Sequence, residues 1–101
     1  MSELIENNLN AINALCKDND IAKLYLFGSY ANGKATVNSD IDMMVEINST
    51  EPLEYADNYF NLKFGLENLL KKEIDLIEYK SVVNPYFKME FEKSKQLLYG
   101  Q

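Results

Sequence analysis

The stretch from Leu26 to Val45 reads LFGSYANGKATVNSDIDMMV and decides the fold class. The segment Ile21 to Phe27 is short, apolar and aromatic, which predicts a buried strand that ends at Gly28-Ser29. The small polar residues that follow suffice for a turn or one helical turn. Ile41 to Ile47 then predicts a second strand, whose apolar run is interrupted near its start by Asp42.

The segments on either side of this stretch alternate between helix and strand. Helices are predicted from Ser2 to about Cys16, from Glu51 to Lys72, and from Asn84-Pro85 to about Gln96. A third strand is predicted from Glu73 to Tyr79. Leu97 to Tyr99 either extends the last helix or forms a short terminal strand. We therefore expect one domain over residues 1–101 of the α/β (α+β) class. Its small mixed three-stranded sheet is flanked by helices in the order α-β-α-β-α-β-α.

The composition of the 101 residues excludes several kinds of site. The chain has ten lysines, 16 acidic residues and a net charge of −6, with no histidine, no arginine and one cysteine. Without histidine there is no Ser-His-Asp or Cys-His triad, and the common zinc sites cannot form. The excess of acidic over basic residues disfavours nucleic-acid binding, because the phosphate backbone is also negatively charged. A lone cysteine fits the reducing cytoplasm, and no apolar run approaches the roughly 20 residues of a membrane span.

Two aspartates open the second predicted strand. Asp40 and Asp42 are two residues apart, so a strand presents both carboxylates on one face. Like charges placed together repel, and Mg²⁺ removes this repulsion because it binds carboxylate oxygens together with substrate phosphates. The long helical connection permits a parallel crossover that brings Asp75 to the same edge of the sheet. Alternatively, Asp75 is only an exposed strand carboxylate.

The Gly28-Ser29 pair predicts a phosphate cradle beside these carboxylates. Glycine lets a phosphate approach the backbone closely, and the amides of the turn with the Ser29 hydroxyl can bind its oxygens. The spacing from Gly28 to Gly33-Lys34 also suggests a P-loop. That motif requires Ser or Thr next, whereas this chain has Ala35, and we set it aside.

The whole pattern resembles the minimal nucleotidyltransferases of the DNA polymerase β superfamily. Their signature is Gly-Ser-x-Ala-Arg-Gly, five further residues, then Ser-Asp-x-Asp. Gly28, Ser29, Ala31, Gly33, Ser39, Asp40 and Asp42 match it in identity and spacing, and Asp75 matches the third family carboxylate. Asn32 stands where the family has arginine, and Lys34 is a nearby point charge.

The resemblance implies a reaction and a set of roles for the matched residues. AMP passes from ATP to a hydroxyl acceptor, with Asp40, Asp42 and Asp75 as the catalytic carboxylates that bind two Mg²⁺ ions. Gly28, Ser29, Ser39 and Lys34 are the expected phosphate-binding residues. Ser29 is expected to donate to phosphate rather than act as a nucleophile, because the chain holds no histidine to activate it.

The resemblance also implies a partner. Stand-alone members of the family look like antitoxins that adenylylate a tyrosine of a small helical toxin of the HEPN class. We expect that role here, in the cytoplasm, with ATP as substrate, with homo- or hetero-oligomers allowed, and with no membrane or direct nucleic-acid binding. The alternative is a non-catalytic module that neutralises its partner by occlusion. The aromatics Tyr55, Tyr59, Phe60, Phe64, Tyr86, Phe87 and Phe91 belong mostly to the core, with some left for a partner surface.

Overall fold

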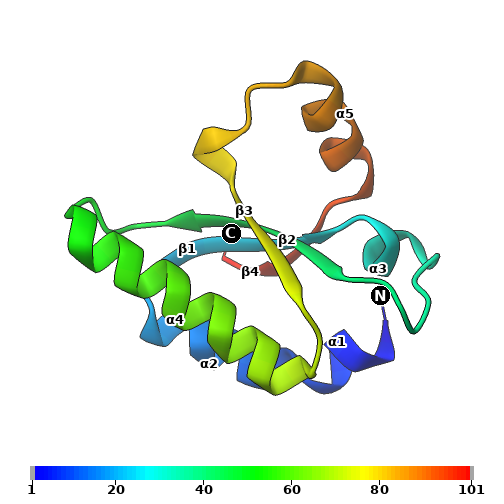
Figure 1. The fold of residues 1–101 in the computed structure, drawn as a ribbon, viewed down its shortest axis with the longest axis horizontal. Helices are drawn as coiled ribbons and strands as arrows, with labels where there is room; N and C mark the ends of the chain where they lie inside the picture. Colours follow the sequence, from blue (N-terminus) through cyan, green and yellow to red (C-terminus); the bar gives the residue numbers. More distant parts are fainter. Residues whose placement is uncertain (1, 101) are drawn as a thin grey trace.

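The two apolar segments around the central stretch pair at the middle of a sheet. In the computed structural model, which describes residues 2–100, β1 (Ile21–Phe27) lies antiparallel to β2 (Ile41–Ile47). β3 (Ile74–Glu78) pairs with β2 in parallel and β4 (Gln96–Tyr99) pairs with β1 in antiparallel, which gives the order β3-β2-β1-β4. The mixed sheet with flanking helices confirms the predicted class (Figure 1).

The prediction of three strands is wrong, because the sheet has four. The last helix, α5 (Pro85–Ser94), ends before Lys95, whose extended backbone leads directly into β4. β4 covers the edge of β1 that β2 leaves open, and its Leu98 is buried. Of the two interpretations that the sequence left open for Leu97 to Tyr99, the terminal strand is therefore the correct one.

The N-terminal helix is also divided. It forms α1 (Glu3–Asn7) and α2 (Leu9–Asp18), and Ser2 caps α1 as predicted, accepting from the Leu4 amide at 3.1 Å. The break lies at Asn8, where the backbone leaves helical geometry and the side-chain amide donates to the Leu4 carbonyl at 2.8 Å. Asparagine side chains compete for backbone groups in this way and so interrupt helices.

Helices lie on both faces of the sheet, as Figure 1 shows, with α2 and α4 (Pro52–Leu70) on one side and α5 on the other. The larger core cluster fills the first face and includes Cys16, which is fully buried as expected; burial raises the pKa of its thiol to about 12. On the second face Phe91 packs with Phe27 and Met44. The connection to α5 includes the short helix η1 (Tyr79–Ser81). Within residues 2–100, none of the helices combines the length and apolarity of a membrane span.

Fewer of the seven aromatic side chains belong to the core than predicted, since Phe60, Phe64 and Tyr86 are exposed. Phe91 is buried, and Tyr59 and Phe87 pack partly against the core. Phe60 and Phe64 stack on the outer side of α4 with their centroids 5.8 Å apart, and about half of each ring is exposed.

Side chains of α4 form hydrogen bonds with the backbone groups on the outer edge of β3. A free strand edge at this place could pair with a strand of another chain. The residues recur every four positions along the helix. The Tyr59 hydroxyl donates to the Leu76 carbonyl at 2.6 Å, and Lys63 Nζ donates to the Ile74 carbonyl at 2.8 Å. Glu67 accepts from the Ile74 amide at 3.1 Å, and this bond and Lys63 lower the pKa of the Glu67 carboxyl. The edge strand that carries Asp75 is thereby fixed against the helix.

Replacing Tyr59 by phenylalanine should lower stability by about 1 kcal/mol, because it removes one hydrogen bond from this edge and leaves the Leu76 carbonyl without that donor. Urea unfolding followed by circular dichroism measures the change. Tyr86→Phe is the matched control, since that side chain is 77% exposed, and it should unfold as the wild type does. Equal midpoints for all three proteins would contradict this role of Tyr59.

Candidate active site

Gly28 turns the chain from β1 directly into a short helix, α3 (Ser29–Asn32). Its backbone has φ 70° and ψ −149°, a conformation that only glycine adopts readily. Among the described residues no side chain caps the start of α3. The Ala31 and Asn32 amides donate to the Gly28 carbonyl at 3.1 and 3.0 Å, so the amides of Ser29 and Tyr30 are the ones left for an anion. This local geometry is that of an anion-binding turn.

The sheet brings the expected carboxylates beside this turn. Phe27, the last residue of β1, lies opposite Asp42, and Asp42 lies opposite Asp75 in the parallel pair. Asp40 immediately precedes β2, two residues from Asp42. Gly28, Asp42 and Asp75 therefore occupy the same end of three adjacent strands, as the crossover argument predicted.

Gly28 and Asp42 are in direct proximity. A Cβ atom built on Gly28 would lie 2.5 Å from Oδ2 of Asp42, closer than real Cβ atoms approach another atom. Only a residue without a side chain leaves room for the Asp42 carboxylate at this place. Glycine is thus required twice here, for its backbone conformation and for the space beside Asp42.

The carboxylates of Asp75 and Asp40 repel that of Asp42 electrostatically. Partial burial, and then the negative charges of Asp75 and Asp40, raise the pKa of the Asp42 carboxyl above its ordinary value. Asp40 and Asp75 are exposed and line a common cavity of about 350 Å³ with Lys63 and Glu67 of α4. A cation placed at this edge would relieve the repulsion.

The donor set fits Mg²⁺ better than a metal that needs a closed protein cage. Across residues 2–100, no three acidic side chains converge closely enough to enclose a metal ion by themselves. Mg²⁺ commonly binds one or two carboxylates and completes its shell with waters and substrate phosphates. Oxygen donors at the open edge formed by Asp40, Asp42 and Asp75 meet that requirement.

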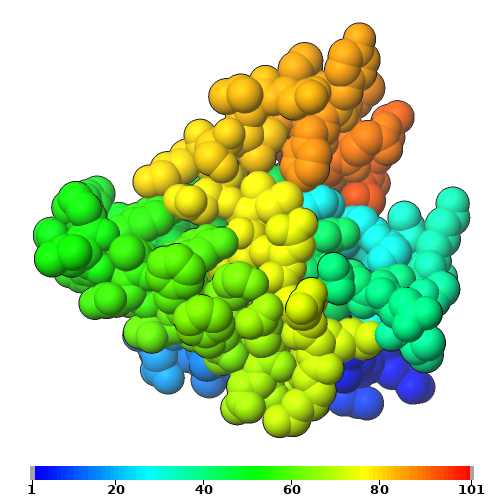
Figure 2. Space-filling model, in the orientation of Figure 1, coloured from blue at the N-terminus to red at the C-terminus, as the bar shows by residue number. Residues whose placement is uncertain are grey.

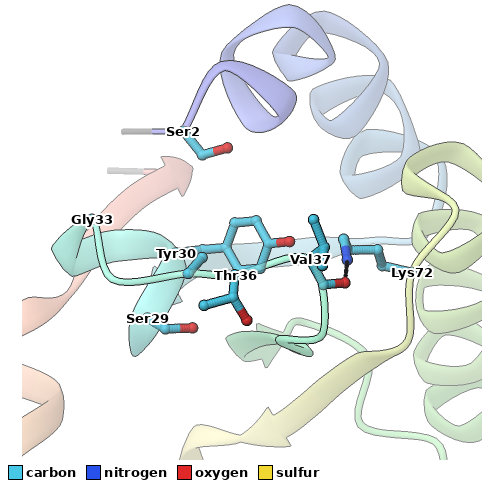
Figure 3. A pocket seen from close by; sticks show the side chains of 8 residues that line it. Ser2, Ser29, Tyr30, Gly33, Thr36, Val37 and Lys72 are labelled. Atoms are coloured by element: carbon cyan, nitrogen blue, oxygen red, sulfur yellow. Dashed lines mark hydrogen bonds between the residues drawn. The ribbon is translucent and has the colours of Figure 1, made fainter.

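A second cavity, of about 570 Å³, opens beside α3. Ser29, Tyr30, Thr36 and Lys72 are among the residues that line it (Figure 3). Lys72 comes from the turn after α4, and its Nζ donates to the Val37 carbonyl at 2.8 Å. Lys72 was not among the predicted site residues, although its position next to the predicted strand at Glu73 placed it at the same edge as Asp75.

A family model described as polymerase beta nucleotidyltransferase matches residues 10–101 of the chain. The chain belongs to this nucleotidyltransferase family. The resemblance drawn from Gly28-Ser29 and Asp40-x-Asp42 is therefore confirmed. Two similar proteins from Methanocaldococcus jannaschii carry the name of candidate protein adenylyltransferases. MJ1379 is 41% identical over 73 residues, 72% of each chain, and MJ0128 is 36% identical over 73 residues, 72% of this chain and 71% of its own.

Solved structures with the same fold come from toxin–antitoxin complexes. A chain in a crystal structure of a toxin–antitoxin with AMP-PNP superposes with a TM-score of 0.72 at 29% identity, covering 93% of this chain and 74% of that one. A chain in the complex of tri-AMPylated Shewanella oneidensis HEPN toxin with MNT antitoxin gives 0.65 at 26% identity, covering 95% and 72%. The nucleotidyltransferase thus shares its fold with proteins of the minimal class.

The remaining expected phosphate ligands of the nucleotidyltransferase lie in the loop between α3 and β2. The Ser39 hydroxyl accepts from the Thr36 amide at 2.9 Å and so shapes this loop. Lys34 is exposed, and its amide donates to Asn32 Oδ1 at 3.0 Å. Asn32, which replaces the family arginine, therefore holds the turn after α3.

Proposed function

We propose that this nucleotidyltransferase is an antitoxin that transfers AMP from ATP to a tyrosine hydroxyl of a small helical HEPN toxin. The observation that supports it most is the strand register, which sets Asp42 between the Gly28 turn and Asp75. The names of the similar proteins, candidate protein adenylyltransferases and an antitoxin bound to an AMPylated toxin, indicate the same reaction. We place the reaction in the cytoplasm, where ATP is abundant.

In this proposal the Gly28 turn and the Ser29 hydroxyl hold the terminal phosphates of ATP. Asp40, Asp42 and Asp75 hold two Mg²⁺ ions. When bound, Mg²⁺ neutralises the charge that develops on the phosphate oxygens. Lys34, exposed in the loop after α3, adds a positive charge on the phosphate side. The protein contributes mainly by orienting the two reactants and by removing the repulsion between them.

The reaction breaks one bond and forms one. The tyrosine oxygen attacks the α-phosphorus, the bond from that phosphorus to the bridging oxygen breaks, and pyrophosphate leaves with the electron pair. The phenolic proton passes to the carboxylate of Asp75, which is exposed at the edge of the sheet. The products are the O-adenylylated tyrosine and pyrophosphate.

The test mixes the purified chain with ATP, Mg²⁺ and its co-purified partner, and intact-mass spectrometry looks for addition of one AMP to the partner. We expect the adduct with the wild type and at least about a hundredfold slower formation with Asp75→Asn. Asp57→Asn, an exposed aspartate of α4 away from the site, is the matched control and should behave as the wild type does. Neutralisation of the toxin without any adduct, equally good in Asp75→Asn, would show occlusion and refute the proposal.

A further inference from the structure

An apolar cavity of about 310 Å³ lies between the end of β3 and α5 and has no role in the proposed reaction. It is formed where β3 passes through η1 into the start of α5, and it is lined by Ile77, Ser81, Val82, Val83, Asn84 and Phe87. Phe87 also packs against Phe27, the residue opposite Asp42, with ring centroids 5.7 Å apart. The cavity therefore lies on the α5 side of the sheet and adjoins the site.

The polar side chains in this lining already have partners. Ser81 Oγ donates to the Glu78 carbonyl at 2.8 Å. Asn84 Oδ1 accepts from the amides of Tyr86 and Phe87 at 2.9 and 3.3 Å and so caps α5. The surface offered to a ligand is mainly that of Ile77, the two valines and Phe87, which suits a flat apolar ring better than the polar edge of a purine.

The order of the phosphate turn and the carboxylates across the sheet indicates which reactant lies near the cavity. The phosphate turn is at the end of β1, Asp42 is on β2 and Asp75 on β3. Ile77 follows Asp75 by two residues, so it lies on the same face about 6.6 Å further along the strand. In phosphoryl transfer the attacking and leaving oxygens are roughly in line. Pyrophosphate leaves toward β1, and the acceptor therefore enters from the side of β3.

We infer that this cavity binds the aromatic ring of the acceptor tyrosine and directs its hydroxyl toward Asp75. The inference rests on the proposed function and adds the residues that select the acceptor. The volume is at the lower end of the range of ligand pockets and is enough for one aromatic side chain. Val83 is 85% exposed at the rim, and the segment from residue 79 to 90 projects from the body above β3 (Figure 2). A chain that carries a tyrosine can reach the cavity there.

Methyl NMR of the full chain tests the inference with N-acetyl-L-tyrosinamide as the probe. We expect saturable shifts of the Ile77, Val82 and Val83 methyl signals with the probe. N-acetyl-L-serinamide should leave them unchanged, because it lacks the ring. AMP is the third ligand. If AMP shifts these methyls and tyrosinamide does not, the cavity holds the base and the inference is overturned. If none of the three ligands shifts these methyl signals, the inference is also overturned.

A pair of variants checks the site without disturbing the fold. Val83→Asp places a charge at the rim and should weaken tyrosinamide binding at least about tenfold, because the ring then meets a carboxylate. Met89→Asp is the control, since Met89 is half-exposed on α5 and does not line the cavity; its binding should equal that of the wild type. Equal binding by Val83→Asp and the wild type overturns the inference.

The two proposals fail in different ways. A chain that adenylylates its toxin, but whose Ile77 and Val83 methyls do not respond to tyrosinamide, refutes this inference and leaves the proposed function intact. A chain that transfers AMP to no acceptor refutes the proposed function, whatever the methyl signals show.

Discussion

Replacing Asp42 by asparagine is expected to slow AMP transfer strongly and to make the free protein more stable. The loss of activity should be about 10³-fold, since even the loss of a group that only supports a metal ligand costs 10- to 100-fold. The gain in stability has a separate cause: the folded chain holds the Asp42 charge at a partly buried place beside Asp75 and Asp40. Asparagine has nearly the same shape and no charge.

The measurement is the midpoint of thermal unfolding in a buffer without metal ions. We expect Asp42→Asn to unfold a few degrees above the wild type at neutral pH. The exposed Asp57→Asn, which also removes one negative charge, controls for the general effect of net charge and should shift the midpoint little. If Asp42→Asn is less stable than the wild type, the charge of Asp42 does not strain the fold.

The difference between Asp42→Asn and the wild type should depend on pH. The pKa of Asp42 is raised in the folded chain above the ordinary 3.8, so between the two values the folded state binds more protons than the unfolded state. The contribution of Asp42 to the stability of the wild type therefore rises as pH falls through this window. Below it, Asp42 is protonated in both states and the gap between the two proteins closes. A gap that stays constant down to pH 3.8 would contradict the assigned cause.

The sequence predicted where the carboxylates lie because their placement depends on local rules. Alternation along a strand puts Asp40 and Asp42 on one face, and a helical crossover returns Asp75 to the same edge. These rules place the residues at one end of the sheet. They do not determine which residue of β1 faces Asp42, because a slip of one residue would turn every side chain to the other face. The pairing of Phe27 with Asp42 is thus known only from the structure.

Other features of the site follow from tertiary packing and have weak signals in the sequence. Lys72 comes after α4, where a lysine commonly does no more than face solvent at a helix end. Its place in the lining of the cavity that Ser29 also lines results from the path of the crossover. Residues Gln96–Tyr99 are too few for periodicity to separate a strand from the end of a helix. The partners that make them a strand lie on β1, more than 60 residues away.

Gly28→Ala is expected to have the second largest effect, and a matched glycine separates its two causes. Alanine at this φ and ψ costs about 1–3 kcal/mol of backbone strain, so the thermal midpoint should fall. In addition, the new methyl group would lie 2.5 Å from Oδ2 of Asp42 and must displace that carboxylate. Since Asp42 is the central carboxylate of the proposed site, AMP transfer should fall by at least about a hundredfold.

Gly33→Ala supplies the comparison. Gly33 ends α3 with φ 80°, so alanine there also introduces left-handed strain, of about 1–2 kcal/mol. A Cβ atom on Gly33 would meet no atom within 4 Å, however, and Asp42 would stay in place. Gly33→Ala should therefore lose stability but keep most of its AMP transfer, measured below the unfolding temperature of both variants. If the two variants lose activity to the same degree, backbone strain in the turn explains the loss, and close packing of Gly28 on Asp42 is not what positions the carboxylate.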